Sequence, residues 1–162
     1  MNFARREPRW AVFFTVLLAL VFQVLPLPSW LEWLSNLRPS FIGLVIIYWS
    51  IFAPHAGGIF AAWMAGIALD VFKGDVLGQN ALAMALVAYI AMTLHQRLRN
   101  QTLIQQSLFV FAVLTLNEFV VWGIEGWSHN TVSSPWRWVQ PMIGAMIWPF
   151  IAMLVGRTHS RN

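Results

Sequence analysis

The chain has 162 residues, of which 59% are hydrophobic and only 10% are charged, and its formal net charge is +4. A soluble domain usually carries about 25% charged residues, so this composition excludes an ordinary water-facing surface and indicates a membrane protein. The sequence contains no cysteine, which excludes disulfides, thiolate nucleophiles and cysteine-ligated metal sites.

Apolar blocks recur along the chain. A basic stretch precedes the first block and no small-residue cleavage site follows it, so we expect an uncleaved first span rather than a signal peptide. The six blocks cover residues 10–25, 41–53, 57–71, 81–94, 103–124 and 136–155. They predict an all-α integral membrane protein with six transmembrane helices, which form a single polytopic domain over residues 1–162.

The second and third blocks are short. The 13 residues of block 41–53 would make a helix of about 20 Å, whereas the hydrocarbon core of a bilayer is about 30 Å thick. A short helix shielded by its neighbours fits this length, and so does a re-entrant, broken pair of helices. Residues 54–58 have the composition of a turn. The alternative topology therefore has four full spans and one broken pair, with both termini still on one side.

Basic residues are distributed unevenly between the two sides that this topology defines. The side of the termini has seven and the opposite side has three: Arg5, Arg6, Arg9, Arg97, Arg99, Arg157 and Arg161 against Arg38, Lys73 and Arg137. Because Lys and Arg collect on cytoplasmic loops, we expect both termini on the cytoplasmic side, where anionic lipid attracts the net positive charge. The basic residues are split among short loops, so we expect no binding of nucleic acid.

Residues 28–39, between the first two blocks, predict a short helix in the membrane interface. Ser29 and Glu32 have the spacing of a capping box at a helix start. Trp30 and Trp33 share the apolar face of this helix, at the headgroup depth that tryptophan prefers. Two interpretations stay open for the segment: a lipid anchor, or a docking ledge for another membrane protein.

One face of the third block carries small residues four positions apart, namely Gly58, Ala62 and Gly66, followed by Asp70. Small residues at this spacing let another helix approach closely in a membrane. The face could bind a partner's helix or form a homodimer. It could equally pack inside the subunit, on the alanines at positions 81, 85 and 88 of the next block.

Two carboxylates interrupt the apolar blocks. Asp70 lies near the outer end of its block, where it either caps the following loop or serves an ion or substrate site. Glu118 lies inside the fifth block, and a polar contact within the bundle is expected there rather than a transport role. The candidate residues for partner packing or for a pocket are Gly58, Ala62, Gly66, Asp70, Trp30, Trp33, Arg38 and Glu118.

Catalytic motifs are absent from the sequence: it has no phosphate-binding loop, no H-E-x-x-H helix and no G-x-S-x-G elbow. The four histidines fall in different loops or termini, without the spacing of metal ligands. We therefore expect no enzymatic activity, no cofactor and no metal.

An ordered set of residues resembles the MreD family of rod shape-determining proteins, which are small integral membrane proteins of bacterial cell elongation. The set is Arg38-Pro39, Tyr48-Trp49, Pro54, Gly57-Gly58, Gly66, Leu69-Asp70, Gly74, Leu77-Gly78, Ala81-Leu82-Ala83 and Tyr89. The resemblance covers nearly the whole chain and is densest over residues 38–89. The tryptophan-rich outer loop and the pair Asn117-Glu118 depart from it.

The resemblance implies a non-enzymatic component of the cell-elongation complex in the bacterial inner membrane. Proteins of this family act with the bitopic protein MreC. They connect cytoplasmic MreB filaments to the peptidoglycan polymerase RodA and its class B transpeptidase partner. The resemblance also implies a fold like that of the substrate-binding subunits of energy-coupling-factor transporters. The alternative function is a small-molecule or lipid-binding transporter subunit, because short or broken helices surround many membrane substrate sites.

Overall fold

A computed structural model describes residues 9–25, 28, 38–127 and 135–159. Over these residues the fold is all-helical, with six α-helices, one short 3-10 helix and no β-strand. The elements are α1 (Arg9–Val24), α3 (Phe41–Phe52), α4 (Pro54–Lys73), α5 (Gln79–Arg99), α6 (Leu103–Trp127), η2 (Pro135–Val139) and α7 (Gln140–His159). The prediction of an all-α chain is confirmed, and each of the six predicted blocks corresponds to one α-helix.

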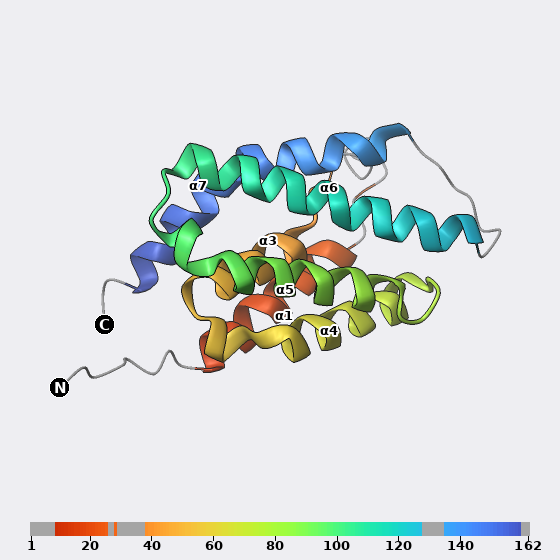
Figure 1. Cartoon of the computed structure of the whole chain (residues 1–162). Helices are drawn as coiled ribbons and strands as arrows, with labels where there is room; N and C mark the ends of the chain where they lie inside the picture. The colour runs from red at the N-terminus through yellow and green to blue at the C-terminus, as the bar shows by residue number, and fades with distance from the viewer. Residues whose placement is uncertain (1–8, 26–27, 29–37, 128–134, 160–162) are drawn as a thin grey trace.

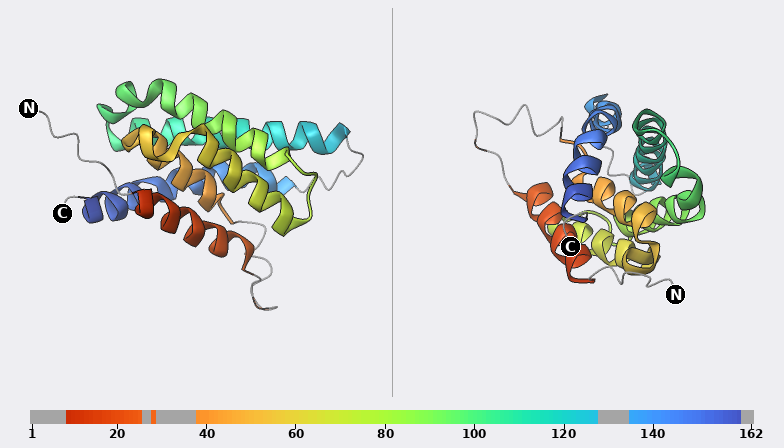
Figure 2. Two further views of the ribbon diagram at one scale, coloured as in Figure 1. Left: turned by 90° about the horizontal axis from the view of Figure 1, so that it is seen from below. Right: turned by 90° about the vertical axis from the view of Figure 1, so that its left-hand side faces the viewer.

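Helix α3 lies at the centre of the bundle, in contact with α1, α4, α5, α6 and α7 (Figure 1). The other helices form a partial ring around it, in which α1 packs on α4, α4 on α5, α5 on α6, and α6 on α7. Among the described residues α1 and α7 do not pack on each other, so the ring is not closed between them. Figure 2 shows the bundle from two further sides, with α1 in red and α7 in blue. Helix α1 begins and helix α7 ends at the same end of the bundle.

The central position of α3 explains why this helix is short and uniformly apolar. It has 12 residues, of which nine are buried, and it is about 18 Å long at the standard rise. The side chain of Ser40 caps its start by accepting a hydrogen bond from the Gly43 N–H. A helix covered by protein on most sides need not match the bilayer thickness, which corresponds to the predicted short, shielded helix.

Helix α4 is longer than the sequence predicted. It has 20 residues because Pro54 starts a helical turn ahead of Gly58, where we expected only a turn. Gly58 has a φ of 47° and a ψ of 159°, which interrupts the helix with a kink. Since positive φ is strained for residues with a Cβ, glycine suits this position.

Buried polar side chains tie the helices together. Gln106 on α6 donates a hydrogen bond to the Leu98 carbonyl at the end of α5 (3.0 Å) and accepts one from the Trp148 indole on α7 (3.2 Å). Thr15 on α1 accepts a hydrogen bond from the Trp49 indole on α3 (2.8 Å). Such bonds satisfy polar groups that would otherwise be costly in an apolar interior.

The outer surface of the bundle is rich in large apolar side chains. Phe60 on α4 and Met146 on α7 are 72% and 75% exposed, and α1 carries a further row of exposed apolar residues. So many exposed large apolar side chains are unusual for a protein surface in water. Two helices, α5 and α6, are by themselves long and apolar enough to cross a membrane.

Candidate functional site: a polar cavity at one end of the bundle

The small-residue face of α4 is occupied by helices of the same chain. A Cβ added to Gly66 would lie 2.4 Å from the Ala81 Cα and 2.7 Å from the Asn80 carbonyl oxygen on α5. Ala62 is buried, in a region lined by residues of α1 and α3. Gly58 forms the kink, and a Cβ there would meet no atom within 4 Å. At Gly66 the structure therefore shows the internal-packing arrangement that the sequence left open.

Asp70 caps the start of α5. Its side chain is fully buried, and its two carboxylate oxygens accept hydrogen bonds from the backbone N–H groups of Gly78 (2.9 Å), Asn80 (2.9 Å) and Ala81 (3.4 Å). The Asn80 side-chain amide donates another (2.8 Å). A carboxylate at a helix N-terminus satisfies unpaired donors and complements the helix dipole. Of the two predicted roles, the structure shows capping.

Arg38, just before α3, binds the C-terminal end of α1. Its guanidinium donates hydrogen bonds to carbonyl oxygens at the end of α1, the shortest to Leu25 (2.7 Å). In the other direction, the Gln23 side chain accepts a hydrogen bond from the Phe41 N–H at the start of α3 (3.0 Å). A cation at a helix C-terminus is stabilising. The predicted interfacial tryptophans, Trp30 and Trp33, lie outside the described residues.

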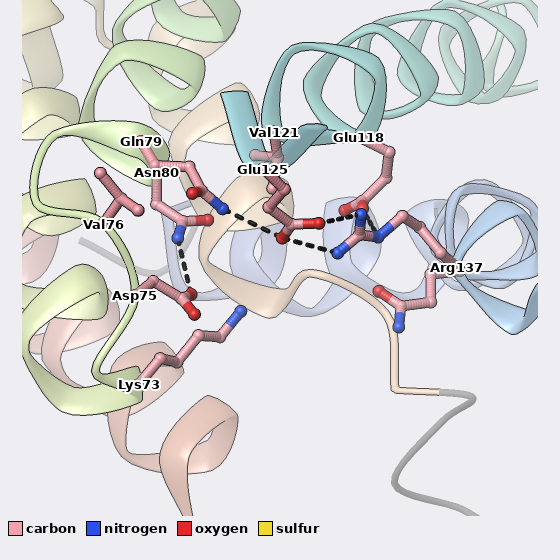
Figure 3. A pocket seen from close by; sticks show the side chains of 10 residues that line it. Lys73, Asp75, Val76, Gln79, Asn80, Glu118, Val121, Glu125 and Arg137 are labelled. Atoms are coloured by element: carbon pink, nitrogen blue, oxygen red, sulfur yellow. Dashed lines mark hydrogen bonds and ion pairs between the residues drawn. The ribbon is translucent and has the colours of Figure 1, made fainter. Parts of the chain in front are cut away.

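A cavity of about 300 Å³ opens between the end of α4, the start of α5, the last turns of α6 and the start of α7 (Figure 3). Its lining is mainly polar and comes from α4, the loop after it, α5, α6, η2 and α7. The lining residues are Lys73, Asp75, Val76, Gln79, Asn80, Glu118, Val121, Glu125, Arg137 and Gln140. The lining residues come from the end of α4, the start of α5 and the end of α6, which lie at the end of the bundle opposite the start of α1 and the end of α7 (Figure 1).

Arg137 on η2 holds one wall of the cavity together. Its guanidinium donates to both carboxylate oxygens of Glu125, with one of these bonds at 2.8 Å, and its Nε lies 3.5 Å from Glu118. The hydrogen bond to Glu125 raises the pKa of the Arg137 guanidinium above its ordinary value, so this group stays charged. Bidentate pairing fixes geometry as well as charge, and it joins η2 to α6.

Gln79 links the start of α5 to the ion pair between Arg137 and Glu125. Its amide nitrogen donates to Glu125 (3.1 Å), which also identifies the other amide atom as the oxygen. That oxygen, Oε1, is buried and has no hydrogen-bond partner. Gln79 as a whole is only 2% exposed. A buried acceptor without a donor is uncommon in folded proteins and calls for an explanation.

The family model for the rod shape-determining protein MreD matches residues 4–157. The chain belongs to the MreD family. It is similar to the rod shape-determining protein MreD of Haemophilus influenzae, with 29% identity over 153 residues, which cover 91% of this chain and 92% of that protein. No solved structure matches the chain significantly.

Membership of the MreD family supports a role in determining rod shape, as a structural membrane protein. Nothing in the described residues of this MreD-family protein indicates an enzyme. No group of three or more His, Asp or Glu side chains within them is arranged to hold a metal ion.

The sequence anticipated only part of the cavity of this MreD-family protein. The sequence predicts a polar contact for Glu118 inside the bundle, whereas its partner in the structure, Arg137, lies on η2 at the wall of the cavity. The contributions of Gln79, Glu125 and Arg137 were missed. One signal was present, because Glu118 and Glu125 are seven residues apart and so share a helix face. Their common partner lies on another element, which no spacing within α6 reveals.

Proposed function

We propose that this MreD-family chain is a non-enzymatic scaffold of the rod complex in the bacterial inner membrane. In this proposal it crosses the membrane six times with both termini in the cytoplasm. It binds MreC and couples MreB filaments to RodA and the class B transpeptidase. The excess of basic residues on the side of the termini supports the orientation.

The observation that carries the scaffold proposal is the open side of the helix ring. Helices α1 and α7 both pack on α3 but not on each other over the described residues. Helix α7, which borders this opening, also carries an outward apolar face at helical spacing: Met142, Met146, Phe150 and Met153. Methionine is flexible and polarisable and suits adaptable binding surfaces. A single transmembrane helix, as a bitopic partner has, would complete the ring.

The proposed partner surface is therefore not the centre of the small-residue face. Gly66 has no room for a second helix, because Ala81 of the same chain already lies against it. The segment that contains Trp30 and Trp33 joins α1 to α3, so a docking ledge there would be continuous with α1. The proposed partner surface therefore includes this ledge beside α1.

Depletion of the protein in its host tests the scaffold proposal. Rod-shaped cells are expected to become round, and re-expression of the wild-type chain is expected to restore both the rod shape and the recovery of MreC with a tagged copy. Unchanged cell shape on depletion would contradict the elongation role. Restored shape without recovery of MreC would contradict the proposed binding while leaving the shape role intact.

The polar cavity favours a second candidate function, a small-molecule-binding subunit with a fold like that of the energy-coupling-factor subunits. About 300 Å³ is at the lower end of ligand pockets in proteins. Saturable uptake of a solute into vesicles that contain the purified chain would support this candidate. Lys73→Gln, which alters the cavity, should then reduce the uptake, and absence of any uptake would remove the candidate.

A further inference from the structure

Tyr89 carries a polar group at the middle of an apolar helix. It stands ten residues from either end of α5 (Gln79–Arg99), which places it about 15 Å from each end at the standard helical rise. Tyr89 is 57% exposed on the outside of the bundle. Helix α5 is one of the two helices that are long and apolar enough to cross a membrane. In a membrane, the Tyr89 hydroxyl therefore lies near the bilayer midplane.

This hydroxyl makes no hydrogen bond with any of the residues that the structure describes. The Thr93 hydroxyl, one turn further on, is satisfied by its own helix, because it donates to the Tyr89 carbonyl (2.8 Å). Lipid acyl chains offer neither donors nor acceptors, and tyrosine in membrane proteins concentrates at the interfaces rather than at the midplane. A hydroxyl kept away from water favours a protein partner that forms a hydrogen bond with it.

The exposed residues around Tyr89 form one narrow row along α5. Helices α3, α4 and α6 contact the rest of its surface (Figure 1). The row consists of Leu82, Leu86, Tyr89, Thr93 and Gln96. Its spacing alternates between four and three residues, which is the spacing of the seam between two helices packed along their length. Threonine and glutamine side chains also form hydrogen bonds between helices in membranes. The row therefore suits a second helix.

A second copy of the chain supplies the matching group at the matching depth. Copies that insert with the same orientation are related by a two-fold axis along the membrane normal, so their α5 helices run parallel and Tyr89 faces Tyr89. A tyrosine hydroxyl can both donate and accept a hydrogen bond, so the two hydroxyls can pair with each other. A polar side chain at one position of such a seam also fixes the register of the two helices.

We propose that this row of α5 is the interface of a two-fold homodimer in the membrane, in which the two Tyr89 hydroxyls form a hydrogen bond with each other. A helix of a different protein would need a polar group at this depth, whereas a second copy has one by symmetry. Helix α5 does not pack on α7 within the described residues, so the dimer leaves the α7 face free for MreC. The inference rests on the membrane-spanning topology of the proposed function but not on the binding of MreC.

Cysteine crosslinking in membranes tests the dimer, because the chain has no cysteine of its own. Leu86→Cys and Thr93→Cys place a thiol about one turn on either side of Tyr89, and Leu108→Cys on α6 and Met146→Cys on α7 are controls at exposed positions. On oxidation with copper phenanthroline, the yield of covalent dimer from positions 86 and 93 should be about tenfold that of the controls, because a fixed pair has a high effective concentration. Equal yields at all four positions, or no dimer from 86 and 93, would overturn the proposal.

Tyr89→Phe tests the hydroxyl itself. The dissociation constant of the dimer is measured by fluorescence energy transfer between labelled copies of the full chain in liposomes as the lipid is increased. Tyr89→Phe should raise this constant about threefold, as the loss of one hydrogen bond between membrane helices does. Ser107→Ala on α6 is the control, because that hydroxyl donates to the Leu103 carbonyl of its own helix (3.0 Å), and it should leave the constant unchanged. No change in Tyr89→Phe, or the same change in both variants, would overturn the pairing of the hydroxyls.

A membrane-impermeant maleimide separates this inference from the topology on which it rests. Applied to both sides of the membrane, the reagent should leave the cysteines at positions 86 and 93 unlabelled until the chain is denatured in detergent. Labelling before denaturation would contradict the membrane placement of α5 in the proposed function, and the dimer with it. Unlabelled cysteines that form no covalent dimer would overturn the dimer alone and would leave the proposed topology intact.

Discussion

Gly66 on α4 lies directly against the backbone of Ala81 on α5, so close that no side chain fits between the two helices. The contact stands one turn from Asp70, whose carboxylate caps the start of α5. The close contact at Gly66 and the cap by Asp70 therefore both join the end of α4 to the start of α5. The polar cavity lies at this end of the two helices. The small-residue face first suggests an external partner, but its centre is used to build the protein itself.

Gly66→Ala should destabilise the protein strongly. The added Cβ would meet backbone atoms of Ala81 and Asn80 at less than 3 Å, so the two helices would have to separate. We expect a loss of about 3 kcal/mol or more in the free energy of unfolding, at the upper end of overpacking effects. Thermal unfolding in detergent measures it.

Gly123→Ala is the matched control for this substitution. Gly123 lies on α6, and a Cβ there would meet no atom within 4 Å. Since alanine favours helix over glycine, this variant should be as stable as the wild type or up to about 1 kcal/mol more stable. Equal effects of the two alanine substitutions would contradict the tight contact at Gly66.

Asp70→Asn should weaken the start of α5. The asparagine side-chain oxygen could still accept hydrogen bonds from some of the backbone N–H groups that Asp70 binds, but its NH₂ group would face the others. The favourable negative charge at the N-terminus of α5 would also be lost. The expected cost is about 2 kcal/mol, measured by thermal unfolding. Asp75→Asn, on the adjacent loop, should cost less, and a larger loss at Asp75 would contradict the capping role of Asp70.

Gln106→Met should loosen the end of the bundle near the termini. The substitution conserves the approximate volume but leaves the Leu98 carbonyl and the Trp148 indole without their partner. Two unsatisfied buried groups should lower the free energy of unfolding by about 2 kcal/mol. The neighbouring exposed Gln105→Met removes one bond to the Thr102 N–H and should cost about 0.5 kcal/mol. A larger loss of stability for Gln105→Met than for Gln106→Met would show that the buried hydrogen bonds of Gln106 are dispensable.

Arg137→Met should destabilise the wall of the cavity. The change leaves Glu118 and Glu125 without their cation while both are largely buried, and removal of one partner of such a pair costs about 3 kcal/mol. Adding Glu125→Gln to this variant should restore part of the loss, because one of the unpaired charges is then removed. Full additivity of the two changes in the unfolding free energy would contradict the direct pair.

The helices could be predicted from the sequence because each carries its own apolar pattern and its own boundary signals. The third block was predicted too short because Pro54 and the glycines after it read as a turn, whereas Pro54 occupies the first turn of α4. The four-residue spacing singled out Gly66 and Asp70, but the choice between an external and an internal partner for this face depends on which helix lies opposite it.

The cavity could not be predicted because its contacts join distant parts of the chain. Gln79 and Glu125 are 46 residues apart and meet only after α5 and α6 pack. Gln23 on α1 and Phe41 at the start of α3 are likewise linked across a connecting segment. A glutamine in an apolar helix gives no local sign of the partner that it will find.

Site-specific photo-crosslinking in membranes tests the central claim, that the partner helix of MreC is met on the open side of the ring. A photoreactive residue is placed at Met146 on α7 and, for comparison, at Leu82 on α5 and Leu108 on α6, all of which are exposed apolar positions. The account predicts a crosslink to MreC from position 146 and none from the other two. Crosslinks from position 82 or 108 but not from 146, or a crosslink from 146 only to a second copy of the chain, would contradict it.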